Sequence, residues 1–160
     1  MKILFVSSEC APFSKSGGLA DVAFSLPPAL QKTGDELTIV TPMYRVTQEN
    51  YGDQFSLIKT CVIHLGQRQL SCALYKGELN GVTVYAIGNE HLFHRPRLYG
   101  YGDDSLRFAF FCRAVIDLLP EFGDLPDILH CNDWETALAI LYLKNDAVLN
   151  DALSHIKTVY

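Results

Sequence analysis

Two short polar segments of the sequence carry the residue types that could bind and transform a ligand. The first is Lys15-Ser16-Gly17-Gly18, which separates an apolar run from a segment with helical periodicity. Glycine lets backbone N–H groups approach an anion closely, and the first turn of a helix adds free N–H donors and a positive dipole end. Because Lys15 adds a mobile positive charge, this segment predicts a site for phosphate or pyrophosphate.

The same residues also fit a simpler interpretation, a tight turn with a solvated lysine. The segment matches neither G-x-x-x-x-G-K-[ST] nor G-x-G-x-x-G, so the fingerprints of ordinary nucleoside triphosphate and dinucleotide sites are missing. The pattern alone leaves both interpretations open.

The second segment is Asn132-Asp133-Trp134-Glu135, which follows the apolar residues Ile128 to Cys131. Its residues are expected at a ligand-binding position, because ligands bind beyond the carboxyl ends of the strands in such a sheet. Each also has a structural alternative, since Asp133 can cap a helix, Trp134 can be core, and His130 can be a hydrogen-bonded structural histidine. A metal centre is not expected, because the two histidines of Glu90-His91-Leu92-Phe93-His94 have no further ligand cluster beside them.

The elements that must position these segments follow from the apolar pattern. Residues 2–7 and 37–41 have the composition of buried strands, and residues 19–32 between them have helical spacing. A kink or break is expected at Pro27-Pro28. This β-α-β order opens a doubly wound sheet.

The middle of the chain predicts an antiparallel insertion, with strands at residues 55–64, 69–76 and 82–87 joined by short turns. A helix at 104–119, a strand at 128–131, a helix at 133–143 and a strand at 156–160 complete the pattern. The fold class is therefore α/β, a Rossmann-like and mostly parallel sheet with helices on both faces and a hairpin insertion. Both polar segments follow strands at their carboxyl ends, so we expect them to lie side by side at one edge of the sheet.

Composition narrows the classes of partner. Of the 160 residues, 49% are apolar and 19% are charged, and the net charge of −5 gives no reason to expect nucleic acid or an anionic membrane. Five cysteines without a C-x-x-C pair suggest reduced, mostly buried thiols and a cytosol-like compartment. The apolar run after Met1 is too short for a signal peptide, and no stretch has the length of a membrane span. The sequence thus favours a cytoplasmic protein.

Several segments together resemble one enzyme family. "KILFVSSECAPFSKSGGLADV", "LTIVTPMY", "HLFHRPRLYGYGDDSLRFAFFCRAV" and "PDILHCNDWETAL" are similar, in this order, to bacterial glycogen synthases and plant starch synthases. The resemblance implies a retaining glucosyltransferase that moves glucose from ADP-glucose to the non-reducing end of an α-1,4-glucan. It implies two Rossmann-like domains across a cleft, no obligatory metal and no cofactor. The absence of a visible transit peptide favours a bacterial source over a plastidial one.

The resemblance also implies roles for individual residues. Asp21 and Asp133 match acidic residues of the catalytic cleft. Lys15, Gly17, Gly18, Tyr99, His130 and Trp134 match positions that contact substrate. Asp104 stands where the family often has asparagine, and Asn132 and Glu135 stand where some members have histidine.

The chain stops at Tyr160, before a catalytic histidine that the resemblance places downstream. Residues 1–160 are therefore expected to be an incomplete amino-terminal domain that is inactive alone, because the nucleotide-binding domain is missing. The alternative is a non-catalytic module that binds glucan or a protein partner. An open edge at strand 156–160 predicts self-association or partial disorder near the carboxyl terminus.

Overall fold

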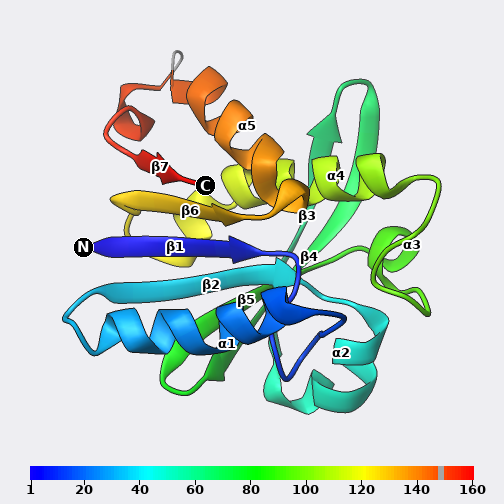
Figure 1. Cartoon of the computed structure of the whole chain (residues 1–160). Coiled ribbons are helices and arrows are strands. Elements are labelled where there is room, and N and C mark those ends of the chain that lie inside the picture. The colour runs from blue at the N-terminus through cyan, green and yellow to red at the C-terminus, as the bar shows by residue number, and fades with distance from the viewer. Residues whose placement is uncertain (148–149) are drawn as a thin grey trace.

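The apolar run at the start of the chain forms a central strand of the sheet (Figure 1). The computed structural model describes residues 1–147 and 150–160. Its strands are β1 (Lys2–Ser7), β2 (Glu36–Pro42), β3 (Ser56–Leu65), β4 (Arg68–Leu79), β5 (Val82–Gly88), β6 (Ile128–Asn132) and β7 (Lys157–Val159). Its α-helices are α1 (Gly18–Gln31), α2 (Arg45–Tyr51), α3 (Glu90–Phe93), α4 (Asp104–Asp117) and α5 (Ala137–Ala147). The 3₁₀ turns are η1 (Gly52–Gln54), η2 (Leu119–Phe122), η3 (Trp134–Thr136) and η4 (Asp151–Leu153).

One seven-stranded sheet has the order β3-β4-β5-β2-β1-β6-β7. The pairs β5–β2, β2–β1, β1–β6 and β6–β7 are parallel, whereas β3–β4 and β4–β5 are antiparallel. The predicted fold class is therefore confirmed. The antiparallel strands extend one edge of the parallel sheet and leave the β2–β1–β6 centre, where the polar segments begin, uninterrupted.

Buried side chains alternate along the central strands, so that each face of the sheet has its own core. Leu4 and Val6 of β1 point into the core formed with α4 and α5, while Ile3 and Phe5 point into the core formed with α1. Helices accordingly cover both faces (Figure 1). This two-sided burial explains why the central strands read as continuous apolar runs.

Helix α1 passes through Pro27 and Pro28 as one continuous element, so the break that these residues suggest is absent. Two adjacent prolines remove two backbone donors from the helix. Ala20, Ala23 and Pro27 are nevertheless buried at helical spacing, and this packing against the sheet holds the turns before and after the prolines in line.

The segment after β6 differs from the predicted helix at 133–143. Asp133 has φ 64° and ψ 172°, so the chain turns sharply, forms the 3₁₀ turn η3 and only then enters α5. This combination of φ and ψ is essentially restricted to glycine, so the backbone of Asp133 is strained. The turn leaves Asp133 and Trp134 exposed at the carboxyl end of β6.

Strand β7 lies at an outer edge of the sheet and pairs only with β6 among the described strands. Val159 and Tyr160 beside this edge are exposed. Self-association through the edge stays a prediction. In the described part of the chain, no helix combines the length and the apolar character needed to cross a membrane.

Candidate functional site

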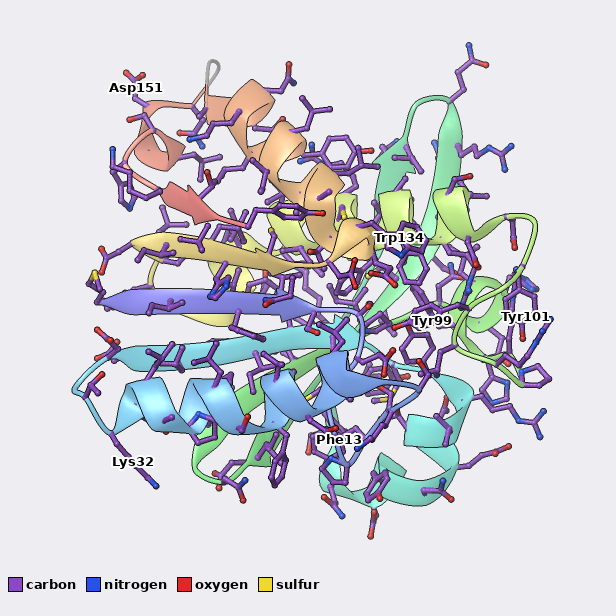
Figure 2. All side chains as sticks on the ribbon, in the orientation of Figure 1. Phe13, Lys32, Tyr99, Tyr101, Trp134 and Asp151 are labelled. Atoms are coloured by element: carbon purple, nitrogen blue, oxygen red, sulfur yellow. The ribbon has the colours of Figure 1, made fainter. Side chains whose placement is uncertain are left out.

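The two polar segments that the sequence singles out lie at the carboxyl ends of the neighbouring strands β1 and β6 (Figure 2). The side-chain amide of Asn132 donates to the carbonyl of Val6 at 3.0 Å, which ties the end of β6 to the end of β1. This position is where open α/β sheets bind ligands. The two segments therefore follow the ends of neighbouring parallel strands, as predicted, and their joint use as one ligand site stays a prediction.

Glu9, two residues beyond β1, holds the loop before α1 in place. Its carboxylate accepts hydrogen bonds from the Ser16 N–H at 2.5 Å, the Ser16 hydroxyl at 2.6 Å and the Gly17 N–H at 3.2 Å. Burial favours the neutral carboxyl, but these bonds and one from Tyr99 outweigh burial and lower the pKa of Glu9 below its ordinary value. Glu9 is thus a buried carboxylate fixed by its donors.

This arrangement changes the predicted phosphate site in one respect. The Ser16 and Gly17 amides, which the sequence offers to an external anion, already bind a protein carboxylate. Space over the loop remains open, because a Cβ added at Gly17 or Gly18 would meet no atom within 4 Å. Packing within the described chain therefore does not require glycine at either position, and a ligand could approach the backbone there.

Lys15 and Asp21, both predicted site residues, pair with each other across the first turn of α1. The Lys15 ammonium donates to both carboxylate oxygens of Asp21, at 2.6 and 2.8 Å. Each side chain is more than half exposed, so water weakens the pair and an incoming phosphate can compete for Lys15. The pair therefore places a mobile cation and a carboxylate next to each other at the start of α1.

Tyr99 and Trp134 reach the site from different parts of the chain and both pack on Phe108 of α4. Their rings lie 5.8 and 5.3 Å from the Phe108 ring, measured between centroids. The Tyr99 hydroxyl donates to Glu9 at 2.7 Å and contacts the Ser8 hydroxyl at 3.0 Å. Trp134 is 52% exposed, so it is not a core residue and offers an apolar surface beside the two polar loops.

Asp133 lies at the turn between β6 and η3. Its carboxylate accepts a hydrogen bond from the Trp134 N–H at 2.7 Å, so the predicted capping role is present, although the element capped is the 3₁₀ turn η3. The side chain is exposed, as are those of Lys15 and Asp21. Asp133 and Trp134 therefore face solvent after β6, and Lys15 and Asp21 face solvent after the neighbouring strand β1.

His130 lies differently from the other predicted residues. It sits within β6, and its ring packs edge-on against Phe5 with centroids 4.9 Å apart. Burial lowers its pKa, which keeps the imidazole neutral near pH 7. Contact between His130 and a substrate stays a prediction. In the Glu90–His94 segment, whose histidines were considered as metal ligands, His94 Nδ1 lies 3.2 Å from Glu90 Oε1.

The sequence analysis assigned no role to several side chains that hold the site residues in position. Ser8, Glu9 and Phe108 lie within the quoted family segments but were given no role, and Glu135 was noted in the second polar segment and as a departure from a histidine in the family pattern. Glu9 and Ser8 follow directly after the first strand, and this position was the available signal.

Comparisons with known proteins agree with the geometry. Residues 2–160 match the family model described as the starch synthase catalytic domain. The whole chain is 44% identical to a glycogen synthase of Bacillus cereus (strain Q1), covering 34% of that protein, and 40% identical to one of Anoxybacillus flavithermus, covering 33%. The chain thus spans about a third of the length of these relatives.

A solved structure of a starch synthase has the same fold as this chain. The catalytic domain of starch synthase IV from Arabidopsis thaliana, bound to ADP and acarbose, superimposes with a TM-score of 0.85 at 30% identity. The match covers 98% of this chain and 32% of that one. With a family model that matches all but the first residue, the chain belongs to the starch synthase catalytic domain family.

Proposed function

We propose that this chain forms the glucan-side part of a retaining glucosyltransferase that moves glucose from ADP-glucose to the non-reducing end of an α-1,4-glucan. The observation that carries the proposal is that the Lys15 and Asp21 pair, at the start of α1 after β1, and the Asp133 and Trp134 turn, after β6, both follow the carboxyl ends of two paired parallel strands. The relatives are glycogen and starch synthases, and one of them binds ADP and acarbose, a nucleotide and a sugar analogue.

The donor phosphates would bind near Lys15. Its ammonium is exposed, and within residues 1–147 and 150–160 its hydrogen-bond partner is the exposed Asp21 carboxylate, so it can turn to a diphosphate and stabilise the charge that develops as the nucleotide leaves. The open space over Gly17 and Gly18 allows close approach to the backbone. Asp21 would then be free to accept hydrogen bonds from sugar hydroxyls.

The sugars would lie toward Trp134 and Tyr99. Aromatic rings give sugar rings an apolar contact surface, and the exposed Trp134 indole is fixed in orientation by Phe108. Asp133 beside it provides a negative charge for the positive charge that grows on the glucosyl ring during transfer. The bond from C1 to the phosphate oxygen breaks, a bond from C1 to the acceptor oxygen forms on the same face, and the proton of the acceptor hydroxyl passes to the departing diphosphate.

The relatives are about three times longer than this chain. By the family resemblance, the remainder supplies the second wall of the cleft and most contacts to the nucleotide. Alignment of donor and acceptor between two walls accounts for a large share of such catalysis. We therefore propose that residues 1–160 need the remaining part to transfer glucose.

Calorimetry separates this function from the alternative of a non-catalytic glucan-binding module. The tested protein is a chimera in which this chain replaces the matching third of the Bacillus cereus (strain Q1) glycogen synthase. Binding of both ADP-glucose and maltooligosaccharides by the chimera is expected. Binding of maltooligosaccharides without ADP-glucose would favour the module, and binding of neither would contradict both.

The Lys15→Ala substitution in the chimera is expected to lower kcat/KM for ADP-glucose by about ten- to a hundredfold. A lysine directed at a phosphate makes charge-assisted hydrogen bonds worth roughly 1.5–3 kcal/mol, which corresponds to that factor. Steady-state kinetics at saturating glycogen measure it, with the exposed Lys32→Ala as the control. Kinetics equal to those of the control would show that Lys15 is only a solvated loop residue.

A further inference from the structure

Two of the five cysteines face each other across the hairpin at the outer edge of the sheet. In the antiparallel register of β3 and β4, Cys61 is paired directly with Cys72. The side chains of such a pair project from the same face of a sheet, and here both belong to or pack against the core formed with α4 and α5. A turn and parts of two strands separate them in the sequence, so no C-x-x-C pattern marks the pair.

The backbone spacing at this pair suits a disulfide. Residues directly opposite each other in an antiparallel ladder have Cα atoms about 4.5–5.5 Å apart. Disulfides join residues whose Cα atoms are about 4.4–6.8 Å apart, so the hairpin already has the separation that the bond requires. The pairing is regular from Lys59 to Leu65, and the one shift of register lies before this stretch, after Leu57.

The other three cysteines lack this arrangement. Cys10 forms an isolated bridge with Ser14, Cys131 is paired with Val6 of β1, and Cys112 lies in α4. All three are buried, and burial raises the pKa of each thiol to about 12. The ordinary role of a buried cysteine, a small apolar side chain within a core, therefore accounts for these three.

Cys61 is the member of the pair that a reagent reaches first. It is partly exposed, whereas Cys72 is only 3% exposed. Both cysteines line a cavity of about 250 Å³, together with Met43, Asn89 and His94. Burial raises the pKa of Cys72, which keeps that thiol protonated and unreactive until a sulfur atom is brought beside it.

We propose that Cys61 and Cys72 form a redox-modification site, a dithiol that a low-molecular-weight disulfide converts reversibly into a cross-strand disulfide. The Cys61 thiol loses its proton to solvent, and its thiolate attacks one sulfur of the reagent, whose other half leaves as a thiolate. Cys72 then loses its proton and attacks the Cys61 sulfur, which forms the Cys61–Cys72 bond and releases the second half. The dithiol gives up two electrons and two protons, and the reagent disulfide becomes two thiols.

The bond fastens the edge strand of the sheet. Among the strands in residues 1–147 and 150–160, β3 pairs only with β4. Along β3, Ile63 alone is buried, while Leu57, Ile58 and Val62 are exposed apolar side chains. A strand with so little buried surface opens more readily than a central strand. A covalent tie to β4 restricts that opening, so the oxidised chain keeps its edge strand in place.

The direct test is a peptide map of the 160-residue chain after exposure to glutathione disulfide at neutral pH. The remaining thiols are blocked with N-ethylmaleimide in urea, and the chain is digested with trypsin without reductant. Cleavage after Lys59, Arg68 and Lys76 puts the two cysteines on separate peptides, residues 60–68 and 69–76. We expect these peptides to be recovered joined and to separate on treatment with dithiothreitol, with two of the five thiols lost.

Three variants assign the bond. Cys61→Ser and Cys72→Ser each remove one partner, so neither is expected to give the joined peptides, whereas Cys112→Ala, a buried control in α4, gives them as the wild type does. Should a variant not fold, the wild-type map still decides. Five unmodified thiols, glutathione retained on Cys61 without the internal bond, or a covalent dimer on a non-reducing gel would each overturn the proposal.

Urea unfolding shows whether the native hairpin accepts the bond. Closing a short loop by a disulfide usually stabilises a protein, and with an ordinary urea slope the midpoint is expected to rise by about 1 M on oxidation and to return on reduction. A midpoint that does not rise would show that the folded hairpin resists the bond, which contradicts the proposal. Neither measurement uses glucosyl transfer, so this inference and the proposed function stand or fall separately.

Discussion

Replacing Asp133 with asparagine is expected to lower kcat for glucosyl transfer by the chimera about a hundred- to a thousandfold. Transfer with retention passes through a transition state in which the glucosyl ring becomes positive. A fixed carboxylate beside that ring stabilises the charge where it develops, and loss of one such electrostatic contact has effects of this size. Asp133 is suited to the role because its sharp turn and its bond from the Trp134 N–H fix the carboxylate.

Asparagine is the substitution that isolates the charge. Its side-chain oxygen can still accept from the Trp134 N–H, and asparagine has nearly the same size and shape as aspartate, so the backbone strain at this position is the same in both proteins. Radiolabelled ADP-glucose with glycogen measures kcat, and the urea midpoint checks that the fold is unchanged. The exposed Asp53→Asn is the control. A variant within threefold of this control would show that transfer does not use the charge of Asp133.

Replacing Arg107 with methionine is expected to reduce the free energy of unfolding of the chain by about 3–5 kcal/mol, the cost of breaking a buried ion pair by removing one partner. The Arg107 side chain is fully buried, pairs with Asp104 at 2.6 Å and donates to the carbonyls of Leu92 at 2.6 Å and Leu98 at 2.9 Å. Methionine keeps most of the apolar stem but leaves all three acceptors without this donor.

Urea unfolding measures this loss as a shift of the midpoint at unchanged slope. Arg45→Met is the matched control, because Arg45 pairs with Glu49 at 2.6 Å on the surface, where such a pair contributes about 0–1 kcal/mol. The two substitutions remove the same charge and differ mainly in burial. Equal losses in both variants would contradict the role given to the Arg107 cluster.

The arrangement of the sheet could be predicted because its signals are local. Apolar runs of strand length mark β1 and β2, and the Leu79-Asn80-Gly81 turn marks a hairpin. The short helices α2 and α3 could not be predicted, since seven and four residues are too few to show a helical period. The continuity of α1 through Pro27-Pro28 could not be predicted either, because tertiary packing decides it.

Only the exposed residues of the candidate site could be predicted from the sequence. The motif residues Lys15, Asp21 and Asp133 follow the carboxyl ends of the paired parallel strands β1 and β6, as the predicted parallel sheet requires. The bonds of Glu9 to Ser16 and to Tyr99 join residues up to 90 positions apart, and no local pattern encodes such a contact. The pairing of Lys15 with Asp21 was likewise invisible, because their six-residue separation crosses the start of a helix.

The most direct test of the proposed function is whether the chimera, in which this chain replaces the matching third of a relative, transfers glucose. Carbon-14 glucose from ADP-glucose is offered with glycogen to the chimera, to its Asp133→Asn variant and to the 160-residue chain alone. We expect label in α-1,4 linkages with the chimera, at least a hundredfold less with the variant, and none with the chain alone. A folded chimera that binds glycogen but incorporates no label would contradict the account.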